Sequence, residues 1–349
     1  MNIKWHTTLL VLASALVCGT ATAQDNTDYS QSSTWRWEMA NDVFFDSDNQ
    51  FSNGFAIQKH GPAASSLDAV GGTAAIGKGL AKFFLPKGDG LTYRESWSFG
   101  QNIQTPGDIE HPDIILNDLP YVGMLAWSNS FVAFDDQRMS AFGWMLGVVG
   151  ESAFGEEVQE NVHDWIGADE PLGWEHQLDD EPILSLFYTK KKKLWRKPSF
   201  DGALAFNTAA SNFVSYGELA LEMRFGRMPQ GFAYIPDPIG RGLHFNATIP
   251  DKDQTAMYGT FVVRATGFVV DMFREGNTFV DDNPWTENNV LDPNDVIGQL
   301  VVGFHYERPK WALRFNFWFT SDTVDPDSLA GDEDPENRGG TITYEWRFD

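Results

Sequence analysis

The sequence predicts an all-β protein, a transmembrane antiparallel β-barrel of about 12 strands. Hydrophobic and polar residues alternate with period two in many segments, which is typical of strands with two different faces. A soluble β-sandwich alternates in the same way, so two further observations decide the choice. Aromatic residues make up 14% of the chain, several of them near strand ends, and ionisable residues recur in mid-strand opposite apolar ones. Outer-membrane barrels have such aromatic girdles and such a polar lumen.

The first residues predict a secretory signal peptide over residues 1–23. Lys4 supplies a positive charge, residues 7–17 form an apolar run, and Ala21-Thr22-Ala23 is a small-residue cleavage site. We expect residues 24–349 to form a single barrel domain. The only cysteine, Cys18, lies in the predicted signal, so the mature chain should contain no disulfide.

Twelve segments alternate clearly enough to be predicted as strands. The last one is the clearest, because apolar residues at the even positions 342–348 alternate with polar residues at 341–347. An even strand count suits a single-chain barrel and puts both termini on the periplasmic side, so that connections 43–51, 103–121 and 150–182 face outward. Connections 61–93 and 227–256 are longer than typical turns. The predicted strands are 34–42, 52–60, 94–102, 122–134, 138–149, 183–190, 200–208, 215–226, 257–271, 296–306, 311–320 and 341–348.

The third outward connection contains a predicted short helix over residues 155–166. At about 100° per residue, its polar residues and its apolar residues fall on two different faces. The polar face carries Glu156, Gln159, Glu160 and His163, and the apolar face carries Val158, Val162, Trp165 and Ile166. We expect a docked helix that presents His163 as a base, although a histidine that merely solvates a loop helix would show the same pattern.

The charge is strongly acidic, and loss of the signal peptide lowers it from −24 to −25 because Lys4 is removed with no acid. This balance argues against nucleic-acid binding and favours divalent cations. Most acids in irregular segments suit a solvated loop surface equally well. They include Asp46, Asp48, Asp281, Asp282, Asp325, Asp327, Asp332 and Asp334. The lysines at 190–193, with Arg196 and Lys197, are predicted to form a solvated turn.

Polar motifs collect in the same outward connections as the helix. In chain order they are Asn41-Asp42, Asp48, Phe51-Ser52-Asn53-Gly54, Gln101-Asn102-Ile103-Gln104-Thr105-Pro106, Asp118-Leu119-Pro120-Tyr121, Gly155-Glu156-Glu157-Val158-Gln159-Glu160-Asn161-Val162-His163 and Gly173-Trp174-Glu175-His176-Gln177. This ordered series resembles the lipid A deacylases of the outer membrane. Members of that family carry Asn-Asp, Asp followed by Tyr-Thr-x-Gly, Gln-x-Ile-Tyr-Thr-Pro, Asp-Arg-Pro-Tyr, Gly-x-x-Val-Gln-Asn-x-x-His and Gly-Trp-x-x-Gln. The match covers residues 37–182 well, and 257–279 and the final strand more loosely.

The resemblance implies a Gram-negative outer-membrane enzyme, with an extracellular active site, that removes 3′-linked acyl groups from lipid A using calcium and a histidine. It implies that His163 takes a proton from the attacking water and that Gln159 orients water or substrate. Asn41 and Asp42 would bind Ca²⁺ through oxygen atoms, and Ser52 would keep the hydroxyl of the family threonine. The implied partner is lipopolysaccharide in the outer-membrane lipid, and we expect a monomer.

The sequence differs from the family motifs at two positions where the family residue would bind a substrate phosphate. The family lysine after Thr-Pro is missing, because no lysine occurs between Lys87 and Lys190, and Leu119 replaces the family arginine. His111 would be a weak substitute at neutral pH. Purely structural roles also stay open for most motif residues, since Asn and Asp at positions 41 and 42 are residue types common in turns. Gln101, Thr105 and Pro106 would then shape a loop, and Gln177 and Glu181 would support the site.

Three other classes of protein remain as alternatives. The chain could be an inactive structural or calcium-binding barrel, or a phospholipid-directed outer-membrane esterase of the serine type. The second needs a serine and a histidine on one strand face, and no spacing in the sequence supplies the pair. A general porin fits least, because 12 strands with Trp144 and Trp318 in the lumen would leave little channel.

Overall fold

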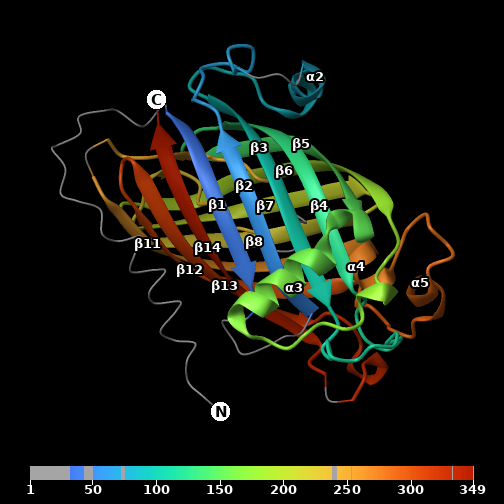
Figure 1. Ribbon diagram of the computed structural model, residues 1–349. Coiled ribbons are helices and arrows are strands. Elements are labelled where there is room, and N and C mark those ends of the chain that lie inside the picture. The colour runs from blue at the N-terminus through green and yellow to red at the C-terminus, as the bar shows by residue number, and fades with distance from the viewer. Residues whose placement is uncertain are drawn as a thin grey trace.

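A closed antiparallel barrel of 12 strands dominates the computed structural model (Figure 1), which describes residues 32–42, 50–71, 75–237, 242–252, 254–331 and 333–348. Each barrel strand pairs with the next in the chain, and β1 pairs with β14 to close the barrel. The barrel strands are β1 (Ser33–Asn41), β2 (Gln50–His60), β3 (Thr92–Thr105), β4 (Val122–Phe134), β5 (Arg138–Val149), β6 (Glu181–Lys197), β7 (Phe200–Ser211), β8 (Val214–Arg227), β11 (Ala256–Asp271), β12 (Val296–Glu307), β13 (Trp311–Asp322) and β14 (Glu336–Phe348). The predicted signal peptide, Asp46, Asp48 and Asp332 lie outside the described residues.

All 12 predicted strands are therefore confirmed, with shifted ends. The largest error is in β6, because the prediction of a solvated turn at the lysines is wrong. The strand continues to Lys197, and Lys191 and Lys193 point into the barrel, where Lys191 Nζ lies 2.6 Å from Glu222 Oε1 and Lys193 pairs with Asp201. Carboxylates on β7 and β8 compensate the buried lysines, so the basic run is compatible with a strand.

The lumen is filled with paired charges. Glu345 accepts from Arg36 at 2.9 Å and from Arg314 at 3.1 Å, and Arg347 bonds Glu307 at 2.9 Å. These residues come from β1, β12, β13 and β14, which are neighbours around the barrel, and all are buried. The prediction of ionisable residues facing a polar lumen is thus confirmed.

Trp318 and Trp144, both predicted in the lumen, lie on opposite sides of the wall. Trp318 is buried inside and donates from Nε1 to Asn337 at 2.7 Å. Trp144 alternates with the inward Met145 and packs edge-on against the exposed Trp127 at 4.9 Å, so its predicted lumen position is wrong. Successive side chains of a strand point to opposite faces of the wall. An error of one residue in the register therefore moves a side chain from the lumen to the outer face.

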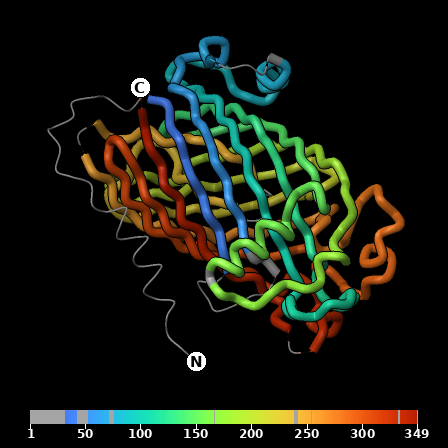
Figure 2. The backbone as a smooth tube through the Cα atoms, in the orientation of Figure 1, coloured from blue at the N-terminus to red at the C-terminus, as the bar shows by residue number. Residues whose placement is uncertain are grey.

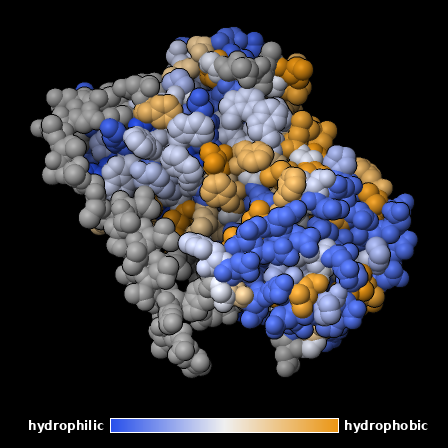
Figure 3. Space-filling model, in the orientation of Figure 1, coloured by the Kyte–Doolittle hydropathy of each residue, from blue (hydrophilic) through white to orange (hydrophobic). Residues whose placement is uncertain are grey.

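The barrel has two different ends, which we call the termini end and the loop end. β1 begins and β14 finishes at the termini end, and figures 1 and 2 show the C-terminus there. The described parts of the connections at the loop end hold 25 of the chain's 49 Asp and Glu but only one of its 25 Lys and Arg, Arg274. Figure 3 shows hydrophobic residues along the barrel side and hydrophilic residues over the loop end.

The long connection between β8 and β11 folds into the lumen from the termini end. It carries a two-stranded ribbon, β9 (Gln230–Gly231) with β10 (Thr248–Ile249). The Arg36 guanidinium lies 3.9 Å from the Tyr234 ring centroid and donates to Phe245 O at 3.1 Å. The connection therefore helps to fill the barrel.

Helices occur only outside the barrel wall or at its ends in the described residues. They are α2 (Ala75–Phe84), η2 (Glu151–Ala153), α3 (Gly155–Ile166), η3 (Trp174–His176), α4 (Met272–Glu275), α5 (Pro284–Asn288) and η4 (Pro326–Ser328). None of these helices is long and apolar enough to cross a membrane.

Candidate active site at the loop end

The predicted loop helix exists as α3 and packs on the outside of the barrel at the loop end, over β3 and β4 (Figure 1). The helix can approach the wall closely because Gly155 of α3 lies against Gly123 of β4, and neither residue has a side chain. A Cβ on Gly155 would lie 3.0 Å from Gly123 Cα and 2.6 Å from a ring carbon of Trp174. Side chains at these positions would push the helix away from the wall.

Gln101 of β3 fixes the start of the helix. Its Nε2 donates to Ala153 O at 2.6 Å and to Phe154 O at 3.1 Å. Phe154 has φ 58°, the only positive φ of a non-glycine residue in the described chain. Such a conformation is uncommon and persists where surrounding contacts hold it. The family-type glutamine thus holds the turn into α3.

Gln159 lies at the junction between α3 and the barrel. Its Oε1 accepts from Trp174 Nε1 at 2.8 Å, and both side chains are buried. Trp174 packs with Tyr121 and Ile103 in a small apolar cluster that also contacts Val158. Because the Gln159 oxygen is used by Trp174, its amide nitrogen is the group available to a substrate or water.

His163 is half-buried one turn beyond Gln159. Its Nδ1 lies 2.5 Å from the carbonyl oxygen of Asp169, in the turn after the helix. A carbonyl oxygen only accepts, so Nδ1 carries the proton and Nε2 is left as the basic nitrogen. Gly167, with φ 70°, donates to His163 O and ends the helix, which allows Asp169 to return to the ring.

The predicted division of α3 into a polar and an apolar face is only partly right. Gln159 and His163 lie on the barrel side together with Val158 and Val162, whereas Trp165 is 76% exposed, not packed. Gln159 and His163 are held by hydrogen bonds to Trp174 and Asp169. These two partners lie outside the helix, so the helical periodicity could not predict the contacts. Glu160 is exposed, as a solvated position would be.

Asn41 and Asp42 are at the loop end of β1. Asn41 pairs with Asn53 of β2 and Gly340 of β14, and its odd position places it on the outer face. Asp42 follows and is buried. In Figure 1 the C-terminal half of α3, which carries His163, passes in front of the ends of β1 and β2. Ser52 lies in β2, where the pairing with β3 shifts register between Phe51 and Asn53.

A family model described as "Outer membrane protein LpxR" matches residues 9–348. The chain belongs to this family. Its fold is similar to the structure of LpxR from Salmonella typhimurium, with a TM-score of 0.68 and 14% identity, covering 90% of this chain and 100% of that one. The β domain of the Bordetella autotransporter BrkA is less similar, with a TM-score of 0.42 and 9% identity over 91% and 99% of the two chains. No curated protein matches the sequence.

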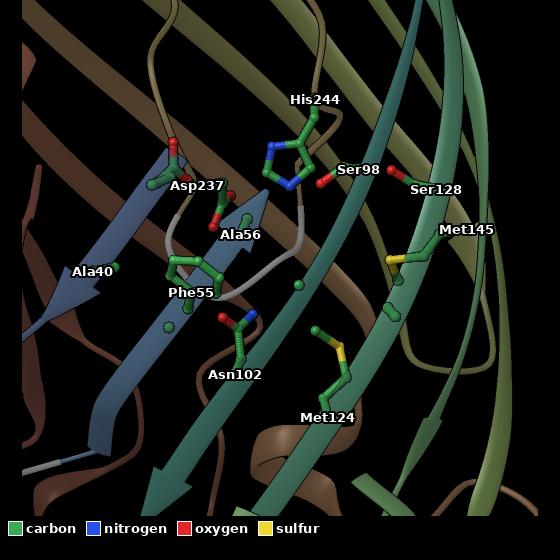
Figure 4. A pocket seen from close by; sticks show the side chains of 14 residues that line it. Ala40, Phe55, Ala56, Ser98, Asn102, Met124, Ser128, Met145, Asp237 and His244 are labelled. Atoms are coloured by element: carbon green, nitrogen blue, oxygen red, sulfur yellow. The ribbon is translucent and has the colours of Figure 1, made fainter. Parts of the chain in front are cut away.

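Membership in the LpxR family supports a lipid A-modifying enzyme of the Gram-negative outer membrane. A cavity inside the barrel, shown in Figure 4, is lined by Ser98, Asn102 and Ser128 of the wall and by Asp237 and His244 of the β8–β11 connection. Asn102 points into this cavity, whereas its neighbour Gln101 points out to α3, so the wall separates the cavity from the helix.

The residues of the predicted calcium site offer suitable atoms. Asn41 and Asp42 supply amide and carboxylate oxygens, the hard ligands that Ca²⁺ prefers. Among the residues that the structure describes, no three His, Cys, Asp or Glu side chains converge as a metal site. Calcium binding therefore stays a prediction based on the donor chemistry of Asn41 and Asp42.

Two other motif residues support a different part of the rim. Glu181 accepts from the backbone nitrogens of Thr278 at 2.9 Å and Phe279 at 3.1 Å, and Gln177 O accepts from Asn283. These bonds hold the β11–β12 connection against β6. Nothing in them connects Gln177 or Glu181 to α3.

The described residues include a serine–histidine pair that the sequence did not predict. His60 Nδ1 lies 2.7 Å from Ser96 Oγ across the β2–β3 ladder. Only the strand register brings together residues so far apart in sequence. Both are buried in the lumen, and a lipid chain at the outer wall cannot reach them, so the pair does not favour a serine esterase.

Proposed function

We propose that this LpxR-family chain hydrolyses the 3′-position acyl ester or esters of lipid A, at a site between α3 and the outer barrel wall. The observation that carries the proposal is the bond between His163 Nδ1 and Asp169 O, because it leaves Nε2 as a base. The loop end would face the outside of the cell, where lipid A forms the outer leaflet.

The barrel wall changes from polar to apolar at the depth of this site. Asn41, Asn53 and Gln101 lie on the outer face of β1, β2 and β3, and the next outward residues toward the termini end are Met39, Phe55 and Phe99, all exposed. An acyl ester joins a polar sugar to an apolar chain. A lipid with its ester at this boundary would lay its chain over Phe55 and Phe99.

The reaction follows from the chemistry of an imidazole base. Nε2 of His163 takes a proton from water while the water oxygen bonds the ester carbonyl carbon. The bond from that carbon to the sugar oxygen then breaks, and Nε2 returns the proton to the sugar oxygen. The Asp169 carbonyl stabilises the imidazolium between the two transfers.

Asn41 and Asp42 would hold Ca²⁺ beside the reacting ester. When bound, the cation would stabilise negative charge that develops on the carbonyl oxygen. The Gln159 amide nitrogen, fixed through Trp174, would donate to water or substrate, and Ser52 would supply a hydroxyl.

Arg338 would supply part of the missing phosphate recognition. Asn41 pairs with Gly340, so Arg338 is the diagonal neighbour of Asn41 on the same outer face, about 7–8 Å away between Cα atoms. Its side chain is 36% exposed and pairs with Asp334 and, at 3.9 Å, with Glu336. The only Lys or Arg of the loop-end connections, Arg274, is buried against Asp271. We therefore propose that Arg338 is the cation that contacts a substrate phosphate.

Purified protein in detergent with Ca²⁺ tests the proposal, using lipid A and phosphatidylethanolamine as separate substrates. We expect fatty acid release from lipid A that is lost in His163→Ala and kept in Asp164→Ala, a change on the exposed face of the same helix. Release from phosphatidylethanolamine alone would instead indicate a phospholipid esterase. No release from either substrate by a folded barrel would indicate an inactive structural or calcium-binding relative.

A further inference from the structure

The helix α2 lies at the termini end, in the connection between β2 and β3 (Figure 1), and it contacts β4 and β5. The Phe84 ring stacks on the outward Phe142 of β5, with centroids 4.4 Å apart and planes 1° from parallel. A Cβ on Gly77 would lie 2.7 Å from Trp144 Nε1. One side of α2 is therefore held tightly against β4 and β5.

A second side of α2 is apolar and exposed. Ile76 is 83% exposed, Phe83 is 85% exposed and Leu80 is 40% exposed. At about 100° per residue these three side chains form one stripe along the helix, adjacent to the side that touches the wall. A stripe of this kind in contact with water would be unfavourable.

The third side of α2 carries lysines that face the preceding loop. Lys78 Nζ donates to Val70 O at 2.7 Å and to Asp68 O at 3.1 Å, and Lys82 Nζ lies 2.6 Å from Asp68. The loop therefore covers the lysine side and leaves the apolar stripe open. Interfacial membrane helices have this arrangement, with basic residues on one side and large apolar residues on another.

The apolar stripe is continuous with the lipid-facing wall. Next to Gly77, Trp144 packs against Trp127, which in turn stacks on Trp97 at 4.8 Å, and Trp127 is exposed on the outer face. Tryptophans gather at the membrane–water interface of outer-membrane barrels. The helix thus lies beside a tryptophan cluster on the outer wall, one member of which is exposed.

We propose that α2 is inserted in the leaflet at the termini end, with Ile76, Leu80 and Phe83 among phospholipid acyl chains and Lys82 at the headgroups. The occupant of the exposed stripe is lipid, because the stripe extends the surface that the barrel already presents to lipid. This inference does not depend on the catalytic proposal.

Site-directed spin labels test the location directly. Ile76→Cys and Phe83→Cys are prepared singly in protein that lacks Cys18, labelled, and placed in vesicles of phosphatidylethanolamine and phosphatidylglycerol. We expect both labels to collide more with dissolved oxygen than with a water-soluble nickel chelate. Leu146→Cys on the lipid-facing wall gives the reference for lipid, and Lys87→Cys in the exposed loop after α2 gives the reference for water.

Heat-dependent mobility in gels confirms that each variant is folded before measurement. A lipid signature at both helix positions supports the insertion. A water signature at either position, matching Lys87→Cys, overturns it, because no other protein is present in the vesicles to cover the stripe.

Discussion

The basic nitrogen of His163 and the cation of Arg338 are the residue-scale features on which the proposed chemistry depends. The ring of His163 is oriented by a backbone carbonyl and not by a carboxylate, since its hydrogen-bond partner is Asp169 O. Arg338 has carboxylate partners on a partly exposed surface, which weakly hold it and which a phosphate could replace. Both residues therefore present an accessible polar group, which in His163 is also oriented by a hydrogen bond.

Arg338→Gln should lower activity on phosphorylated lipid A about tenfold or more, mainly through KM. A charge-assisted bond contributes about 1.5–3 kcal/mol, which sets this scale. Kinetics on lipid A with and without its phosphates provide the measurement, and Arg338→Lys should recover part of the effect. Equal losses of activity on both substrates would show that Arg338 does not recognise the phosphate.

Asp118 should make the β3–β4 connection sensitive to pH. Burial raises the pKa of Asp118 to about 6, against the backbone bonds from Gly107 and Leu119, which lower it. A raised folded-state pKa means that the contribution to stability is complete below about pH 3.9 and is lost as pH rises through about 6.

Hydrogen exchange checks this prediction. Protection factors in residues 106–121 should fall between about pH 4 and pH 6, and Asp118→Asn should flatten the change. Protection that instead rises over this range would contradict the assigned pKa direction.

At the scale of elements, α3 is held by contacts that its own sequence does not contain. Gln101 holds its start, Trp174 holds Gln159, and Gly123 permits close approach. The docking surface is therefore shared among β3, β4 and η3.

Gly155→Ala should lift α3 from the wall. Its new Cβ would meet Trp174 and Gly123, and overpacking of this kind costs about 1–3 kcal/mol. We expect faster amide exchange in residues 155–166 and lower activity, with barrel melting unchanged. Gly79→Ala in α2 is the matched control, because nothing lies within 4 Å of its new Cβ. Unchanged exchange in Gly155→Ala would show that the close approach is not needed.

The strands were predictable because alternation is a local property of the chain, and all 12 appear in the structure. The end of β6 could not be predicted in this way. Lys191 and Lys193 can point into the lumen only because Glu222 and Asp201 on other strands compensate their charges. In the same way, the motifs predicted α3 but not the burial of Gln159, which depends on Trp174 in η3. Contacts between distant segments account for both errors.

At the scale of the whole molecule, paired charges and the β8–β11 connection occupy the described lumen of the barrel. Arg36, Arg314 and Glu345 occupy the lumen, and Tyr234 of the β8–β11 connection packs on Arg36. The acidic charge collects instead at the loop end, beside the candidate calcium ligands.

Planar-bilayer recordings should therefore show no stepwise conductance. A filled lumen leaves no continuous water path, unlike the wide barrels of porins. Stable open-channel steps from the folded protein would contradict this account of the lumen.

We propose that a histidine on a docked helix makes this barrel a lipid A deacylase. Mass spectrometry of lipid A from cells that express the chain or its His163→Ala variant, with calcium present, tests it most directly. We expect loss of an acyl or acyloxyacyl mass with the native chain, and a rate of loss that is about 10²–10⁴-fold lower in the variant. Unchanged lipid A with the native chain folded in the membrane, or equal deacylation by the variant, would contradict the claim.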